Sequence, residues 1–331
     1  MSAKLNDMIV CPVCKGRLLQ GDGERRELVC PRCRLAFEVR HDIPVMLRNA
    51  ARSLSDNEAR HYSERSAALD PSEVLMSFTV IIPARLKSSR LPDKPLADIC
   101  GRPMIVRVAE RALSCGADRV VVAVDDASVY EACAAAGLDV IMTDPHHPTG
   151  TDRLAEAVAK IGLADDEIVV NLQGDEPLMP LNVIRDVADL LASRPDCAMA
   201  TAAHTIHDVE SFFNPNVVKV VLDDRGTALT FSRAPIPWPR DHFRETKESL
   251  PEGFAPLHHL GLYAYRAGFL RRFPTLPQAP LEKLESLEQL RALYYGERIA
   301  VMVLDAALPA GVDTQKDLDR VRAIFEKSAP V

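Results

Sequence analysis

The sequence predicts an α/β fold with a mainly parallel sheet, preceded by a small β domain. Two observations predict the larger part: apolar runs of strand length alternate with amphipathic stretches after residue 77, and polar motifs directly follow several of those runs. A repeated Cys-x2-Cys pattern within the first 33 residues predicts the smaller part. With 47% hydrophobic and 26% charged residues, the 331-residue chain can bury a large core.

The alternation begins near residue 78 and continues along much of the chain. Strand-like apolar runs lie at 78–84, 119–124, 139–143, 167–172 and 197–203, and amphipathic stretches lie near 103–115, 126–136, 151–161 and 180–193. This alternation is typical of a parallel sheet that is covered by helices on both faces. In such a fold, ligands bind beyond the carboxyl ends of the strands.

Charge and hydropathy argue against two classes of function. The net charge is −7, and the residues after 70 carry 28 Lys and Arg against 37 Asp and Glu, which disfavours general nucleic-acid binding. No apolar run approaches the roughly 18 residues that cross a membrane, and the start MSAKLNDMIV lacks the apolar segment of a signal peptide. We therefore expect a cytoplasmic protein that binds neither a membrane nor a specific nucleic acid.

Four of the eight cysteines have the spacing of a metal site. They form two Cys-x2-Cys pairs separated by 15 residues, at Cys11, Cys14, Cys30 and Cys33. Two such pairs on tight turns can offer four thiolates to one tetrahedral Zn²⁺, so we expect one structural zinc. The alternative is a redox pair or a site that has lost its metal. The other four cysteines are scattered among apolar neighbours, where we expect buried thiols.

Domain boundaries follow from changes in composition. Residues 1–50 have too little apolar content to fold comfortably without a metal, whereas 51–75 are polar and rich in Ala, Ser and Glu. Met76 resembles an internal start, as if two coding sequences had been joined. We predict a small zinc-ribbon-like domain at 1–58, a partly helical linker at 59–76 and a large domain at 77–328.

A basic loop follows the first predicted strand of the large domain. The segment ARLKSSRLPDKPL at 84–96 contains Arg85, Arg90 and Lys94, and two prolines stiffen it. Guanidinium groups grip phosphate oxygens in bidentate fashion and lysine adds a compact charge, so the loop suits a triphosphate. It is not a P-loop, because the sequence contains no G-x4-G-K-[ST]. The alternative is a solvated basic face.

Acidic residues follow two other predicted elements. The segment VVNLQGDEPLMP at 169–180 ends a strand with Gln173 and Asp175, at the sheet edge that carries the basic loop. Asp313 precedes a helical pattern in GVDTQKDLDRVR. A carboxylate beside phosphate-binding cations usually holds Mg²⁺. The alternatives are an acidic turn for the first motif and a helix N-cap for Asp313.

Eight motifs occur in a fixed order along the large domain. They are VIIPARLKSSRLPDKPL, HPTGTDRLAE, VVNLQGDEP, NPNVVKVVLD, FSRAPIPWPRD, HHLGLYAYR, PLEKLESLEQLRALYYGE and GVDTQKDLDRVR, which together span about 77–326. In order and spacing they resemble the 3-deoxy-manno-octulosonate cytidylyltransferase family. The resemblance implies a nucleotide-diphospho-sugar transferase fold and a homodimer. It also implies transfer of CMP from CTP to 3-deoxy-D-manno-octulosonate (KDO) with Mg²⁺, releasing pyrophosphate, for lipopolysaccharide biosynthesis.

The resemblance also assigns roles to individual positions. It places Arg85, Arg90 and Lys94 on the CTP phosphates, and Gly150, Thr151 and Arg153 on the cytosine and ribose. It matches Asp175 and Asp313, which are 138 residues apart, to the metal-binding aspartates. The phosphate and metal groups together form the predicted catalytic set. The positions assigned to the sugar acid are Gln173, Arg233, His259, Tyr263, Glu288 and Gln289. Without the resemblance, His259 and Tyr263 would be interpreted as strand residues that face the core.

Two positions depart from the family pattern. Asp93 stands where the family has the glycine of RLPGKP, and it adds a negative charge beside the predicted phosphate site. His258 stands where a basic residue usually precedes the HLGxY motif. Its charge near neutral pH depends on its surroundings.

The N-terminal segments carry a second resemblance. MIVCPVCKGRL, LVCPRCRLAFEVRHDIPVML and ARSLSDNEA resemble short zinc-ribbon-like bacterial proteins related to the small activator subunit of tRNA and protein methyltransferases. Many such proteins have lost some cysteines, whereas this chain has all four. With 12 basic against 10 acidic residues in the first 70, the electrostatic case for RNA is weak, so we expect a protein partner.

Two alternatives to this interpretation stay open. One is a cytidylyltransferase for another acidic sugar, such as amino-KDO or a sialic acid. The other is a zinc-ribbon adaptor whose transferase domain has decayed. Against decay, Lys94, Arg153, Asp175 and Asp313 are all intact.

Overall fold

The structure is a computed structural model that describes residues 9, 11–13, 18–22, 25–31, 33–40, 43–67, 77–87 and 91–328. The chain divides into two compact units. The first comprises the chain up to Ser77 and the short segment 112–118, and the second comprises Phe78–Arg111 and Arg119–Val331. Cys14, Met76 and Arg90, which the sequence analysis singled out, lie outside the described residues.

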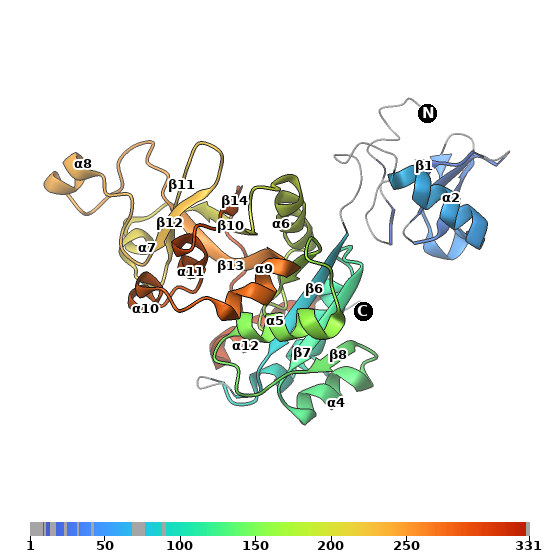
Figure 1. Cartoon of the computed structure of the whole chain (residues 1–331), viewed down its shortest axis with the longest axis horizontal. Helices are drawn as coiled ribbons and strands as arrows, with labels where there is room; N and C mark the ends of the chain where they lie inside the picture. Colours follow the sequence, from blue (N-terminus) through green and yellow to red (C-terminus); the bar gives the residue numbers. More distant parts are fainter. Residues whose placement is uncertain are drawn as a thin grey trace. The chain divides into compact units, whose positions relative to one another are not determined.

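A small antiparallel sheet forms the first unit, drawn in blue in Figure 1. Its elements are β1 (Leu19–Gln20), β2 (Glu27–Cys30), β3 (Leu35–Arg40), β4 (Ile43–Pro44), the 3-10 turn η1 (Arg48–Ala50), β5 (Arg52–Ser53) and helix α2 (Asp56–Ala67). The first four strands are neighbours in chain order, and β5 pairs with β3. The predicted small β domain is therefore confirmed.

Helix α2 extends across the domain boundary that was predicted at residue 58. It continues to Ala67, and Ala59 and Tyr62 are buried together with Leu19 and other side chains of the sheet. The Tyr62 hydroxyl also accepts a 2.9 Å hydrogen bond from the backbone N–H of Asp22. Residues 59–67 thus belong to the first unit and are not a linker. The sequence analysis missed this because two apolar residues at i and i+3 make too short a stripe to stand out in a polar segment.

Among the described residues, one nine-stranded sheet forms the centre of the second unit. The strands predicted from the alternation are β6 (Phe78–Ala84), β7 (Arg119–Val124), β8 (Asp139–Met142), β9 (Ile168–Asn171) and β10 (Met199–Thr205). Strand β6 pairs in parallel with both β7 and β9, and β7 pairs in parallel with β8. These strands are nearly continuous apolar runs, as expected where helices cover both faces. The predicted α/β fold with a mainly parallel sheet is confirmed.

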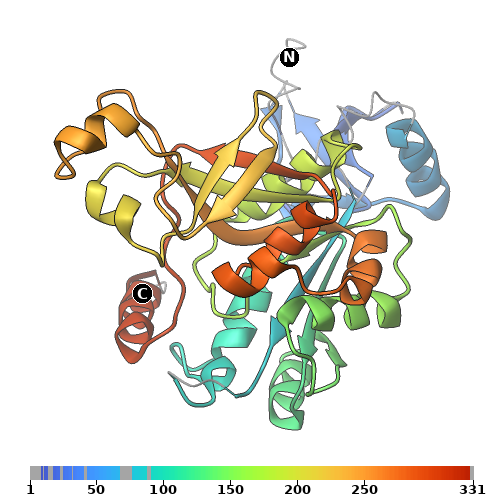
Figure 2. The ribbon, with the colours of Figure 1, turned by 60° about the vertical axis from the view of Figure 1, so that its left-hand side comes forward.

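Four later strands extend the sheet and add antiparallel pairs to it. They are β11 (Lys219–Leu222), β12 (Ala228–Ser232), β13 (Leu257–Arg266) and β14 (Ile299–Leu304). Strand β13 runs antiparallel to β9, β10 and β11, while β14 is parallel to β10. Figure 2 shows the sheet from the yellow hairpin of β11 and β12 to the green β8. Because β6, β7 and β9 are parallel, their carboxyl ends meet at one edge.

Helices cover the sheet and bury its apolar side chains. Four of them, α3 (Met104–Ala112), α4 (Ala127–Ala135), α5 (Gly150–Ile161) and α6 (Leu181–Ser193), occupy the predicted amphipathic stretches. The others are α7 (Val209–Phe213), α8 (Arg240–Glu245), α9 (Ala267–Arg272), α10 (Pro280–Glu285), α11 (Gln289–Tyr294) and α12 (Gln315–Ser328), with 3-10 turns η2 (Lys94–Leu96) and η3 (Phe273–Thr275). Helices α5 and α9 lie side by side in Figure 1. Within the described part of the chain, no helix has the length and apolar character of a membrane span.

Candidate active site

A polar cavity of about 470 Å³ opens at the carboxyl ends of β6 and β9. Its wall combines the loop after β6, the start of α5, the loop after β9, strand β13 and the residues just before α11 and α12. Most of the predicted site residues line it: Arg85, Lys94, Gly150, Thr151, Arg153, Gln173, Asp175, Tyr263, Glu288 and Asp313. Tertiary folding therefore brings together positions that are separated by more than 200 residues in the sequence.

Three predicted sugar-acid residues are not part of the described cavity wall. The Arg233 side chain donates hydrogen bonds to backbone carbonyls of Glu285 at 2.6 Å and Pro215 at 2.9 Å. His259 is buried, with its Nε2 3.1 Å from the Thr201 hydroxyl, and Gln289 is buried at the start of α11. Arg233 and His259 are thus hydrogen-bonded to neighbouring protein groups, and Gln289 is buried, none of which the sequence motifs reveal.

Burial sets the charge of the two adjacent histidines on β13. Burial, with a contribution from His258, lowers the pKa of His259 to about 3. Burial also lowers the pKa of His258 to about 4, helped by His204 and Lys219, and its Nδ1 lies 3.0 Å from Nε2 of His204. His258 is therefore neutral at pH 7 and adds no positive charge at this position of β13.

Lys94 joins the two predicted metal-binding aspartates. Its ammonium donates to Asp175 Oδ2 at 2.6 Å and to Asp313 Oδ1 at 2.9 Å. Burial alone would lower the pKa of Lys94, but the two carboxylates outweigh it, so the pKa is raised and the side chain stays charged. Asp175 and Asp313 thus converge on a single cationic group.

Glu176 places a third carboxyl group near Asp175, Asp313 and Lys94. Burial and the nearby charges of Asp175 and Asp313 raise the pKa of Glu176 to about 7. Carboxylates that repel one another in a partly buried site are the donor set that a hard divalent cation stabilises. The residues present therefore fit Mg²⁺, with Asp175 and Asp313 as the side chains that would hold it.

Backbone geometry explains two features of the neighbouring loops. Asp93 precedes η2 with φ of 49°, in the left-handed region that glycine adopts without strain and that Asp tolerates better than most residues. Gly174 leaves little room for a side chain, since an added Cβ would lie 3.1 Å from the carbonyl oxygen of Pro83. The glycine lets the loop after β9 pass close to the end of β6.

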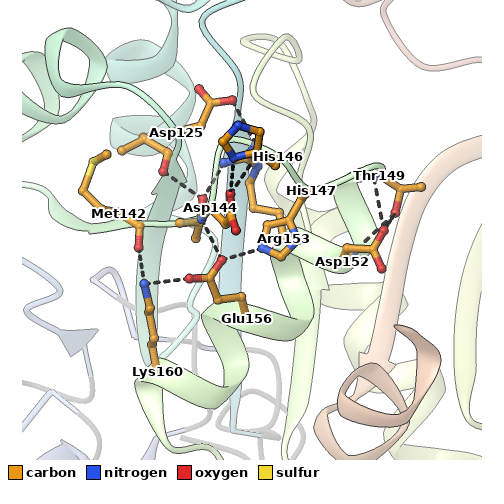
Figure 3. Close-up of polar contacts among 12 residues, drawn as sticks. Asp125, Met142, Asp144, His146, His147, Thr149, Asp152, Arg153, Glu156 and Lys160 are labelled. Carbon is orange, nitrogen blue, oxygen red and sulfur yellow. Dashed lines mark hydrogen bonds and ion pairs between the residues drawn. The ribbon is translucent and has the colours of Figure 1, made fainter. Parts of the chain in front are cut away.

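Arg153 is fully buried and is held by the residues that directly follow β7 and β8. Its guanidinium donates to Asp125 Oδ2 at 2.9 Å (Figure 3) and also to the Thr143 hydroxyl. The other oxygen of Asp125 accepts the backbone N–H of Leu86 at 3.0 Å. Asp125 thus ties Arg153 on α5 to the basic loop after β6. The sequence analysis missed Asp125, although its position directly after the strand 119–124 was a usable signal.

Glu156 anchors the loop between β8 and α5, as Figure 3 shows. Its carboxylate accepts the backbone N–H of Asp144 at 2.8 Å, lies 2.5 Å from His147 Nε2 and pairs with Lys160 at 2.7 Å. Burial opposes its ionisation, but the hydrogen bonds from Lys160, Asp144 and His147 outweigh burial and lower the pKa of Glu156 to about 2. At the end of the loop, Thr149 and Asp152 form a capping box that starts α5.

Unsatisfied polar atoms gather at this cavity. Among the described residues, three buried side-chain atoms lack a hydrogen-bond partner: Arg153 Nε, Asn171 Oδ1 and Glu288 Oε1. All three residues line the cavity. An unsatisfied buried polar group costs about 1–3 kcal/mol, so such groups are normally rare. Their gathering at one cavity indicates that a polar ligand completes the site.

A separate cluster of thiols lies in the first unit. The Sγ atoms of Cys11, Cys30 and Cys33 lie within 4.8 Å of one another, and Cys11 Sγ is 3.9 Å from Cys33 Sγ. The backbone N–H of Cys33 points at Cys30 Sγ at 3.3 Å, an arrangement that favours a thiolate. Three of the four predicted ligands thus converge as a structural zinc site requires, and Cys14 lies outside the described residues.

Comparison with known proteins decides the family of the second unit. Residues 79–299 match the family described as Cytidylyltransferase. The chain belongs to the cytidylyltransferase family. This cytidylyltransferase is 58% identical over 250 residues to the 3-deoxy-manno-octulosonate cytidylyltransferase of Herminiimonas arsenicoxydans, a match that covers 76% of this chain and 99% of the relative.

A solved structure and a second family match agree with this result. The solved structure is a CMP:2-keto-3-deoxy-manno-octonic acid synthetase complexed with CTP; it is 43% identical, with a TM-score of 0.68, and covers 77% of this cytidylyltransferase and 100% of its own chain. Residues 2–42 match the family described as Trm112p-like protein. Both resemblances found in the sequence are confirmed.

Proposed function

We propose that this cytidylyltransferase transfers CMP from CTP to KDO and releases pyrophosphate. The observation that carries the proposal is the convergence of Lys94, Asp175 and Asp313 at the strand-end cavity, because it joins a cation suited to phosphate to a carboxylate pair suited to a divalent metal. The 58% identity to a 3-deoxy-manno-octulosonate cytidylyltransferase supports KDO as the acceptor.

Each part of the cavity has groups suited to one part of the substrates. Arg85 and Lys94, with Arg90 from the same loop, would bind the triphosphate and stabilise charge on the departing pyrophosphate. Gly150, Thr151 and Arg153 would contact the nucleoside, and Asp125 would hold Arg153 in place. Gln173, Tyr263 and Glu288 would bind the sugar acid. The assignment of Arg233, His259 and Gln289 to the sugar rests on their motifs alone.

The reaction exchanges one bond at the α-phosphorus of CTP. The anomeric hydroxyl oxygen of KDO forms the new bond in line with the bond to the leaving pyrophosphate, and the hydroxyl loses its proton. Mg²⁺ held by Asp175 and Asp313 would neutralise charge on the phosphates. The proposal needs no covalent intermediate with a side chain. The protein's contribution is to orient both substrates and to place positive charge where the pyrophosphate leaves.

A pyrophosphate-release assay tests the proposal. The purified protein is supplied with CTP, Mg²⁺ and one of a panel of 2-keto sugar acids that includes KDO, amino-KDO and a sialic acid. We expect turnover with CTP and KDO, and much slower turnover when ATP or GTP replaces CTP. Faster turnover with another sugar acid would show that this acid, and not KDO, is the acceptor. Equal turnover with ATP and CTP would contradict the assignment as a cytidylyltransferase.

We also propose that the protein is a homodimer. Two neighbouring elements, α10 and α11, carry large apolar side chains in water, among them Leu284 at 84% and Tyr294 at 55% exposure. Exposed apolar side chains close together favour burial against another protein surface. Light scattering after size-exclusion chromatography should give twice the mass of one chain. Leu284→Glu should lower that mass, and a wild-type protein with the mass of one chain would contradict the proposal.

For the first unit we propose one zinc ion held by Cys11, Cys14, Cys30 and Cys33, and a protein partner. The convergence of three of these thiols supports the metal site. Elemental analysis should find one zinc per chain in the wild type, and less in a Cys30→Ser variant. Zinc content that is unchanged in this variant would contradict the ligand set.

A further inference from the structure

The cavity contains a polar side chain that neither the motifs nor the resemblance assigned. Asn171 is the last residue of β9, is only 4% exposed and lines the cavity. It lies between the two halves of the site, because β9 pairs with β6 on one side and places Asn171 opposite Tyr263 of β13 on the other. A buried amide at that place needs hydrogen-bond partners.

A second polar group in the same cavity is only partly hydrogen-bonded. Glu288 Oε2 accepts a hydrogen bond from the Thr151 hydroxyl, and Thr151, Glu288 and Asn171 all line the cavity. The other oxygen of this carboxyl group, Oε1, is not used in that bond.

Asn171 and Glu288 each have an unsatisfied acceptor. Asn171 Oδ1 and Glu288 Oε1 have no hydrogen-bond partner among the described residues, and both residues line the cavity. A ligand can satisfy them only with donor groups. Phosphate and carboxylate groups of the substrates cannot donate, whereas the ribose of CTP and the sugar acid both carry hydroxyls.

We propose that Asn171 is a substrate-binding residue whose Oδ1 accepts a hydrogen bond from a hydroxyl of the bound substrates. The hydroxyl belongs either to the ribose of the nucleotide or to the sugar acid, since Asn171 lies where the two halves of the cavity meet. The identity of these substrates rests on the proposed function. Burial restrains Asn171 and the bond from Thr151 restrains Glu288, which reduces the reorganisation needed on binding.

The test combines one substitution with substrates that lack single hydroxyls. Asn171→Leu has a similar shape but can neither donate nor accept. The nucleotide arm uses CTP, 2′-deoxy-CTP and 3′-deoxy-CTP, and the sugar arm uses KDO and analogues that each lack one hydroxyl. We expect Asn171→Leu to raise the KM of one of the two substrates about tenfold, the usual effect of one lost hydrogen bond. With the analogue that lacks the bound hydroxyl, wild type and variant should have the same KM.

Two controls separate a substrate contact from loss of folding. Val170→Ala removes buried bulk from the neighbouring position of β9, and Val170 is not among the described residues that line the cavity. It should lower stability without changing either KM. The wild type alone gives an independent readout, because one single-deoxy analogue should raise its KM about tenfold even if Asn171→Leu does not fold.

Two results would overturn the inference. One is a folded Asn171→Leu variant with wild-type KM values for both substrates. The other is a loss that stays the same with every deoxy analogue, which would mean that Asn171 only maintains local structure. A wild-type protein that does not turn over CTP with KDO would refute the proposed function instead. In that case the binding of CTP and its deoxy analogues, measured by calorimetry, still tests the nucleotide arm.

Discussion

Replacing Asp125 by asparagine should disturb the nucleotide half of the site and the stability of the second unit together. The carboxylate of Asp125 holds the Arg153 guanidinium at 2.9 Å and the backbone N–H of Leu86 at 3.0 Å. Asparagine has nearly the same shape but a neutral amide, so only one of its two terminal atoms can accept. The NH₂ group of the asparagine must therefore face either the Arg153 guanidinium or the backbone N–H of Leu86. Both of these are donors, so one of the two hydrogen bonds is lost.

The size of the effect follows from the burial of Arg153, whose exposed fraction is 0%. Breaking a buried ion pair by removing one partner costs about 3–5 kcal/mol, because a buried charge is left uncompensated. Thr143 still accepts from Arg153 in the variant, and the amide oxygen can serve one former contact. We therefore expect the lower end, about 3 kcal/mol. With an m value of about 3 kcal/mol/M in urea, the unfolding midpoint should fall by about 1 M.

Urea unfolding and calorimetric titration with CTP measure the two consequences. The chain has a single tryptophan, Trp238, so its fluorescence reports on the second unit. We expect Asp125→Asn to bind CTP at least about tenfold more weakly, since Arg153 is no longer held in place. Asp126→Asn is the matched control, because Asp126 caps α4 through the N–H of Ser128 at 2.8 Å and does not contact Arg153. The reasoning is refuted if Asp125→Asn has the wild-type midpoint and wild-type affinity for CTP.

Three further predictions concern the metal pair, the loop anchor and the first unit. Asp175→Asn or Asp313→Asn should lower pyrophosphate release at least about 100-fold while circular dichroism stays unchanged, because each removes one charge from an electrostatic site; wild-type turnover would make them ordinary turn and cap residues. The pKa of Glu156 is lowered from 4.5 to about 2. Its ionised form therefore stabilises the fold fully above about pH 4.5, and this stabilisation is lost as the pH falls toward 2. The difference in urea midpoint between wild type and Glu156→Gln should accordingly be constant from pH 6 to 5 and shrink toward pH 3; a constant difference throughout would show that ionisation of Glu156 does not matter. A chain that begins at Met76 should have the same oligomeric state as the full chain and keep its turnover of CTP and KDO, since every described residue of the cavity lies in the second unit. Loss of most activity in a folded protein of that oligomeric state would show that the first unit supports catalysis.

Local sequence patterns were sufficient for the elements of the parallel core. The run at 78–84 forms β6 with the predicted limits. A nearly continuous apolar segment of strand length is typical of a strand that is buried on both faces, so the pattern alone indicated the element. Helix α2 behaved differently. Its contacts through Ala59 and Tyr62 depend on a sheet built from residues up to 40 positions away, so its own polar sequence suggested a linker.

Motifs in a fixed order specify residue types at each position, so they were sufficient to predict the family, the strand ends that carry charge and most residues of the cavity. Which side chains face the cavity and which are held by the protein depends on how distant segments pack together. Lys94 meets Asp175 and Asp313 across 81 and 219 residues of sequence, whereas Arg233 and His259 are held by neighbouring groups. Asp125 and Asn171 were missed because a polar residue at a strand end, or inside a motif such as VVNLQGDEP, does not by itself indicate which group its side chain contacts. Their importance comes from hydrogen bonds that exist only after distant segments have been brought together, and the geometry of those contacts is a property of the packed chain.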